Sequence, residues 1–253
     1  MEEIAWLNWG FLDWNLVIAN YDFYIEGIWN TLNLTVLSLI FGFMISIPLA
    51  FARAIKHPIF NGPIWCFTYF IRGTPLLVQA YLIYYGLGGL EVVRDSIFWY
   101  VLEDAWNCAL VAFVISAAAY QTEILRGAIE ATPFGEVEAA IASGMSSFTR
   151  MRRIILPSAL RRALPMYSNE VIFTVHSSVV ASTLTIVDIL GAGRFVNGKY
   201  YVAYEGFISA AILYMIIIYG VAKVFKFVEA RYLKHLNQRD TSNDPIILAP
   251  GAL

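Results

Sequence analysis

The chain has 253 residues, of which 59% are hydrophobic and 14% are charged, and its formal net charge is −2. Soluble chains average about 45–50% apolar and about 25% charged residues, so this chain has too little charge to cover the surface of a soluble domain. The composition also excludes a disordered chain and a small disulfide scaffold. Without a basic excess to neutralise phosphates, nucleic-acid binding is disfavoured. The composition predicts an all-α integral membrane protein that lies in the lipid bilayer as one helical domain.

The first 26 residues precede the first long apolar stretch. Trp6, Trp9 and Trp14 carry amphipathic rings of the kind that settle at a membrane interface. The start of the chain is acidic, whereas a cleavable signal begins with a basic region. We therefore expect residues 1–26 to form an interfacial segment.

Long apolar stretches follow at regular intervals. A helix that crosses about 30 Å of hydrocarbon needs about 20 mostly apolar residues. The pattern predicts a transmembrane domain over residues 27–228. Its five expected spans are residues 28–52, 63–90, 105–125, 163–190 and 203–227.

The Lys and Arg residues divide unequally between the two sides that five spans create. Thirteen of the 17 fall on one side and three on the other, while Arg72 lies inside the second span. Cytoplasmic loops carry the excess of positive charge, so we expect a periplasmic N-terminus and a cytoplasmic C-terminus. Residues 126–162 then form a 37-residue cytoplasmic loop. Residues 229–253 form a cytoplasmic tail, which we expect to be disordered.

The cytoplasmic loop carries one spaced pattern. Its members are Glu138, Ala139, Ala140, Gly144, Ile154, Leu156 and Pro157. Good helix formers over residues 136–143 predict a short helix, and Gly144 predicts its end, because glycine tolerates the left-handed conformation of a C-cap. The small alanine side chains in this helix would let another protein approach closely.

The pattern reproduces EAA-x3-G-x9-I-x-LP, and in this the chain resembles the permease subunits of ATP-binding-cassette (ABC) importers. The resemblance implies that the short helix is a coupling helix, which docks on a separate ATPase subunit. An ordinary surface helix between two spans is the alternative interpretation.

Other segments resemble the polar amino-acid branch of these permeases. Residues 72–79 read RGTPLLVQ, and residues 120–129 look like the third span of that branch. Residues 156–172 look closest to the M-type permeases of histidine/lysine/arginine/ornithine importers and to related opine permeases. The resemblance covers roughly residues 20–236.

This resemblance implies the type I importer permease fold and a multi-pass location in the bacterial inner (plasma) membrane. It implies four kinds of partner: a dimer of ATP-binding subunits, a second and non-identical permease, a periplasmic amino-acid-binding protein and the lipid bilayer. ATP and magnesium would be held by the ATPase subunits, so we expect no cofactor on this chain.

No ATPase site of its own is expected. Residues 193–200 approach the phosphate-binding pattern GxxxxGK[ST], but Tyr200 stands where Ser or Thr would hold magnesium. The segment also falls between spans four and five, where we expect a glycine-rich outer turn. The histidines and cysteines show no metal-ligand spacing, so no metal site is predicted. We expect a transport subunit rather than an enzyme.

Glu170 lies seven residues into the fourth span. An ionisable group inside a membrane costs about 2.5–3.5 kcal/mol on insertion scales, so it invites a functional hypothesis. Glu170 either pairs with the cationic side chain of a substrate or forms a salt bridge with Arg72 or another subunit. Arg72, Asn169 and Ser177 are predicted to line the same substrate pathway as Glu170.

Two more polar residues mark the fourth span. His176 is expected to be a hydrogen-bonded core histidine. Asp188 is expected at a solvated end of the span, with contact to the external binding protein as the alternative. Together these features predict a permease that carries polar, basic amino acids such as arginine, lysine, histidine, ornithine or related opines. A permease for neutral polar amino acids and a non-transporting membrane sensor or anchor are the alternatives.

Overall fold

The computed structural model describes residues 12–55 and 57–233, and the regular elements of this part are helices. In chain order the α-helices are α1 Trp14–Ala19, α2 Tyr21–Ala54, α3 Pro58–Gly73, α4 Leu76–Tyr81, α5 Glu91–Arg94, α6 Trp99–Leu102, α7 Ala105–Glu130, α8 Phe134–Ala142, α9 Ser147–Arg150, α10 Leu156–Ser177, α11 Ile189–Tyr200 and α12 Ala203–Tyr232. Between them lie the π turns η2 Leu82–Gly86 and η4 Met151–Ile155 and the 3-10 turns η3 Leu87–Gly89 and η5 Ser178–Leu184.

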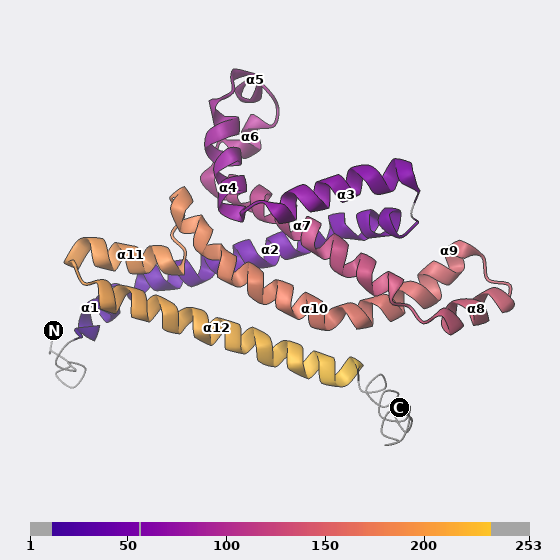
Figure 1. Cartoon of the computed structure of the whole chain (residues 1–253). Helices are drawn as coiled ribbons and strands as arrows, with labels where there is room; N and C mark the ends of the chain where they lie inside the picture. Colours follow the sequence, from indigo (N-terminus) through magenta and orange to yellow (C-terminus); the bar gives the residue numbers. More distant parts are fainter. Residues whose placement is uncertain (1–11, 56, 234–253) are drawn as a thin grey trace, which may run out of the picture.

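Three helices of the described chain, α2, α7 and α12, are long and apolar enough to cross a membrane. The helical run through α10 and the following α11 make a fourth if the pair, bent by 44°, is counted as one span. α7 packs against α2 and α10, and α10 packs against α12, so the long helices form one body (Figure 1). The expectation of an all-α fold is confirmed for the described residues. The number of spans and their orientation stay predictions.

The expected spans 28–52, 105–125 and 203–227 lie within α2, α7 and α12. Each of these helices is continuous because its sequence has no interruption strong enough to break it. Pro48 is tolerated inside α2.

In the structure, the expected second span, residues 63–90, is not one continuous helix. Pro75 disfavours a helical conformation at the residue before it, and Thr74 adopts an extended conformation (φ −113°, ψ 140°) that ends α3. The Gln79 side-chain amide donates hydrogen bonds to the carbonyl oxygens of Ile71 (2.7 Å) and Thr74 (3.0 Å). The RGTPLLVQ segment is thus a helix break whose freed carbonyl groups are satisfied by its own glutamine.

The expected fourth span, 163–190, is also not one helix. The helical run that includes α10 ends at Leu184, and Thr185 takes a left-handed conformation with φ 67°. Asp188 then caps a new helix by accepting a hydrogen bond from the Gly191 backbone N–H (2.7 Å).

Residues 193–200 lie in α11, so the expectation of a glycine-rich turn there is wrong. Gly193 serves close packing instead. A Cβ built on Gly193 would lie 2.5 Å from the carbonyl oxygen of Gly206, so the contact between α11 and α12 requires glycine. Ala192 and Val196 supply the buried face that makes this segment a helix.

The expectation that Asp188 is solvated is wrong, since its exposed fraction is 0%. The Tyr214 hydroxyl donates a 2.8 Å hydrogen bond to its second carboxylate oxygen. Asp188 therefore joins the start of α11 to α12.

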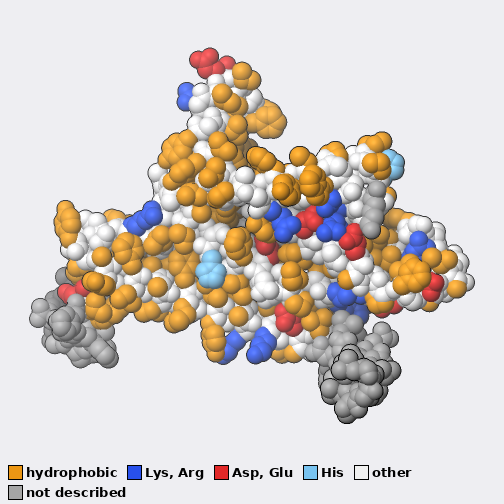
Figure 2. Space-filling view, in the orientation of Figure 1, with side chains coloured by type: hydrophobic (Ala, Val, Ile, Leu, Met, Phe, Trp, Pro, Cys, Tyr) orange, Lys and Arg blue, Asp and Glu red, His pale blue; other side chains and the backbone are white. Residues whose placement is uncertain are grey.

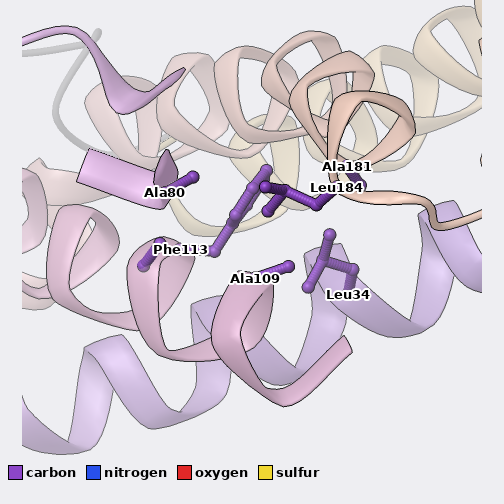
Figure 3. Close-up of a cluster of buried hydrophobic side chains, with 7 residues drawn as sticks. Leu34, Ala80, Ala109, Phe113, Ala181 and Leu184 are labelled. Atoms are coloured by element: carbon purple, nitrogen blue, oxygen red, sulfur yellow. The ribbon is translucent and has the colours of Figure 1, made fainter. Parts of the chain in front are cut away.

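The core lies where α2, α4, α7 and η5 meet. Figure 3 shows the side chains that gather between these elements: Leu34, Ala80, Ala109, Phe113, Ala181 and Leu184. Phe113 lies in a cluster with four buried alanines and two leucines, and six of the buried residues of its own helix are alanines. Small side chains let helices approach closely in a bilayer, where packing rather than water exclusion holds them together.

The expectations for Trp6 and Trp9 and for most of the tail fall on residues 1–11 and 234–253, outside the described part. Trp14 begins α1, and α12 extends through the first residues of the expected tail to Tyr232.

Candidate functional site

The first half of the loop pattern lies in α8 and the turn that follows it, and α8 and α9 together form a two-helix unit at one end of the molecule (Figure 1). The expected end of the short helix at Gly144 is confirmed. Gly144 has φ +71°. Its backbone N–H donates a hydrogen bond to the carbonyl oxygen of Ile141 (2.9 Å), and the backbone N–H of Met145 donates one to the carbonyl oxygen of Ala140 (3.1 Å). This pair of hydrogen bonds is the Schellman arrangement, which needs a left-handed residue where Gly144 lies.

The first three residues of the loop pattern differ in their exposure to solvent. Glu138 and Ala139 are exposed, whereas Ala140 is buried. The expectation that Ala140 offers its side chain to another protein is therefore wrong. Residues three positions apart share a helix face, and Val137 on the same face packs against a core cluster of the chain.

Three large apolar side chains are exposed on the loop that contains α8 and α9. Phe134 is 73% exposed, Ile141 is 54% exposed and Phe148 is 75% exposed. Hydrophobic side chains are visible among charged ones at this end of the molecule (Figure 2). Large exposed apolar groups that are rimmed by charge are typical of a protein interaction surface.

The second half of the pattern, Ile154, Leu156 and Pro157, lies where η4 runs into α10. All three side chains are partly buried. Proline lacks the N–H for a normal helical hydrogen bond, and the wide turn η4 ends two residues before Pro157. This half of the pattern therefore forms the start of the long helix α10.

Side-chain hydrogen bonds tie the loop to α7 and α10. The Ser158 hydroxyl on α10 donates to Glu136 on α8 (3.2 Å). Arg162 donates to Ser158 (2.7 Å) and to the hydroxyl of Thr132, which follows α7 (2.7 Å). The loop is thereby connected to two helices that also line a cavity.

That cavity has a volume of about 500 Å³ and lies between α3, α7 and α10. It includes three of the four predicted pathway residues, Arg72, Asn169 and Glu170. The remaining lining residues are Tyr120, Glu123, Ile124, Arg126, Met166 and Phe173. Its volume falls within the range of small-molecule sites.

Glu170 is 7% exposed and lines this cavity and a smaller one beside it. Ser177, the fourth predicted pathway residue, lines only the smaller cavity, with Leu76 and Phe113. Glu170 and Phe173 are the two residues that line both cavities, and Glu170 is the charged one.

The salt bridge between Glu170 and Arg72, one of the alternatives for Glu170, is not formed in the described chain. The Arg72 guanidinium instead lies over the ring of Tyr120, 5.1 Å from its centroid. His176 is exposed and not in the core as expected, because it lies on the outer face of α10.

Glu123 also lines the cavity, and both oxygens of its carboxylate accept hydrogen bonds from side chains. The sequence pattern did not indicate this residue as part of the site. Glu123 accepts hydrogen bonds from Arg53 (3.0 Å), Thr68 (2.9 Å) and Arg126 (2.8 Å). Arg126 also pairs with Glu130. The only sequence signal was an acidic residue at the end of a span, near several arginines.

Comparisons with known proteins place the chain in a family. Residues 38–234 match the family of binding-protein-dependent transport system inner membrane components. The chain is 41% identical to the histidine/lysine/arginine/ornithine transport system permease protein HisM of Escherichia coli strain K12, over 90% of this chain and 96% of that protein. It is 37% identical to the nopaline transport system permease protein NocM of Agrobacterium fabrum strain C58, over 90% and 95% of the two chains.

A solved structure has the same fold. The chain matches a crystal structure of an amino acid ABC transporter with histidines at a TM-score of 0.78 and 28% identity, covering 87% of this chain and 99% of that one. The resemblance to ABC importer permeases that the loop pattern indicated is confirmed. The chain belongs to the family of binding-protein-dependent transport system inner membrane components, as a permease of the histidine/lysine/arginine/ornithine type.

Proposed function

We propose that this chain translocates basic amino acids or related opines across the inner membrane by alternating access, as one permease of an ABC importer. The observation that carries the proposal is the buried carboxylate of Glu170, which lines a cavity of about 500 Å³ and has no ion-pair partner in the described chain. The names of the relatives, which cite histidine, lysine, arginine, ornithine and nopaline, support a cationic substrate.

The proposed assembly contains two ATP-binding subunits, a second and non-identical permease, and a periplasmic binding protein. ATP and magnesium are held by the ATP-binding subunits. In the proposed topology the chain crosses the membrane five times, with its N-terminus outside and its C-terminus in the cytoplasm, as the distribution of Lys and Arg favours.

In this mechanism the ATPase contacts the exposed apolar residues of α8 and α9. Closure of the ATPase pair moves this unit, and the hydrogen bonds of Ser158 and Arg162 transmit the movement to α10 and α7. α10 is well suited to this role because it carries Pro157 of the loop pattern at one end and Glu170 about 20 Å further along. The cavity then opens alternately to the two sides.

Substitution of Glu170 tests the substrate role. Glu170→Gln removes the charge and nearly keeps the shape, so cationic substrates should lose more uptake than neutral ones. A lost ion pair in a partly hydrated pathway corresponds to a roughly 5- to 150-fold change. Uptake of arginine and of glutamine is measured for both forms and normalised to assembled complex. The ratio of arginine to glutamine uptake should fall in the variant.

An unchanged ratio would remove Glu170 from substrate recognition and would favour neutral substrates. Asn169→Ala is the matched control, because Asn169 is uncharged and lines the same cavity. Its effect on the ratio should be small. The alternative of a non-transporting sensor or anchor predicts no uptake in any form.

A further inference from the structure

Four charged side chains line the cavity, and they differ in whether they form ion pairs within the described chain. Glu123 and Arg126 are bound to each other, and their remaining hydrogen bonds go to Arg53, Thr68 and Glu130. Arg72 and Glu170 form no ion pair in the part of the chain that the structure describes. The cavity therefore presents one free positive and one free negative group to a ligand.

The guanidinium of Arg72 lies over an aromatic ring. Its guanidinium lies over the Tyr120 ring at 5.1 Å, and the Tyr120 ring in turn packs against Phe173 with 5.7 Å between centroids. Stacking uses the flat face of a guanidinium and leaves the N–H donors along its edge available. Those donors match the two oxygens of a carboxylate in a bidentate pair.

The position of Arg72 also suits a binding role. It lies in the last turn of α3, directly before the break at Thr74 and Pro75 that Gln79 stabilises. The side chain is exposed to the cavity rather than buried against a partner. A structural arginine in a membrane segment would instead be paired with a carboxylate.

We propose that Arg72 binds the α-carboxylate of the amino acid in transit, while Glu170 faces its cationic part. This inference rests on the proposed function and adds a second recognition element to the same cavity. A zwitterionic ligand with an additional positive group supplies a partner to both charges at once. Arg72 then contributes to every amino acid, because the α-carboxylate is common to all, whereas Glu170 contributes selectively to cationic ones.

The test compares arginine with agmatine, which is arginine without its carboxylate. Binding of each compound is measured on the purified complex of this chain with its partner permease and ATPase subunits, in the absence of the binding protein. The wild-type complex should bind arginine roughly 10- to 100-fold more tightly than agmatine. Arg72→Gln should bring the two affinities together. Arg72→Lys should retain part of the preference, because it keeps the charge and loses the bidentate geometry.

Arg94 provides the matched control. Its guanidinium lies over the ring of Trp99 at 5.7 Å, which is the same kind of contact outside the cavity. Arg94→Gln should leave the ratio of arginine to agmatine affinity unchanged. Glu170→Gln should weaken arginine and agmatine together, since both carry the guanidinium.

The outcomes separate the two proposals. A wild-type complex that binds arginine, combined with an Arg72→Gln or Arg72→Lys complex that keeps the full preference over agmatine, overturns the role of Arg72 and leaves the proposed function intact. A wild-type complex that binds no basic amino acid overturns the proposed function itself.

Discussion

Glu123 accepts hydrogen bonds from side chains on three helices, Arg53 on α2, Thr68 on α3 and Arg126 on its own helix α7. The Arg53 and Glu123 side chains are only 9% and 12% exposed. Removing one partner from a buried ionic network leaves the others without compensation, which costs far more than the loss of a surface pair. This network therefore fixes part of the lining of the cavity that Glu170 also lines.

We predict that Glu123→Gln destabilises the assembled complex by about 3 kcal/mol, because two guanidinium groups lose their common carboxylate. The matched control is Glu130→Gln on the same helix. Glu130 is 37% exposed, and its ion pair with Arg126 should contribute less than about 1 kcal/mol. Denaturant unfolding of the purified complex measures both. Equal losses in the two variants would contradict a central role for Glu123.

At this scale the sequence revealed some roles and hid others. Glu170 could be identified because a carboxylate inside an apolar span is costly wherever its partners lie. The partners of Glu123 could not be identified, because several arginines lie at plausible spacings and only the packing of α2 and α3 selects one. The contact between Arg72 and Tyr120 was hidden as well, since tyrosines are common in membrane helices. The burial of Asp188 depends on Tyr214, which is distant in the sequence.

The helices that the sequence predicted best are those with unbroken apolar stretches, α2, α7 and α12. Hydropathy averages over about 20 residues, so it concealed the local breaks at Thr74–Pro75 and at Thr185. Pro75 is a visible signal of the first break. The second break is followed by a local cap, in which Asp188 accepts a hydrogen bond from the Gly191 N–H, and by a tertiary contact of the same carboxylate with Tyr214.

Gly144 is the position where a predicted local conformation has a functional consequence. A Cβ at Gly144 would meet no atom within 4 Å, so a substitution acts only through the left-handed backbone conformation. A β-branched residue is strained in that conformation, whereas asparagine tolerates it. A comparison of valine with asparagine therefore separates backbone strain from contact.

We predict that Gly144→Val lowers coupled arginine uptake about five- to thirtyfold, which corresponds to about 1–2 kcal/mol of strain against the formed loop. Membrane insertion should be unchanged, because the loop lies outside the long apolar helices. Gly144→Asn should transport close to the wild-type level. Uptake and ATP hydrolysis are measured on the same proteoliposomes. Wild-type coupling in the valine variant would show that the Schellman turn does not position this loop for the ATPase.

Across the whole molecule, the loop of α8 and α9 and the charged cavity belong to one connected structure. α10 begins at the loop and continues to Glu170, and α7 carries Glu123 and ends beside the loop. The family and the helical fold could both be inferred from the sequence, because the loop pattern is local and the apolar stretches are long. The convergence of α3, α7 and α10 around one cavity is a property of the packed chain alone.

The most direct test of the account is ATP-dependent uptake of labelled arginine into proteoliposomes. These contain this chain, its partner permease and ATPase subunits, with the binding protein on the side from which arginine is taken up. We predict that arginine accumulates when ATP is supplied to the ATPase subunits. Accumulation should be abolished when those subunits carry a substitution that prevents ATP hydrolysis. Arginine uptake that does not depend on ATP hydrolysis, or its absence from the complete assembly, would contradict the account.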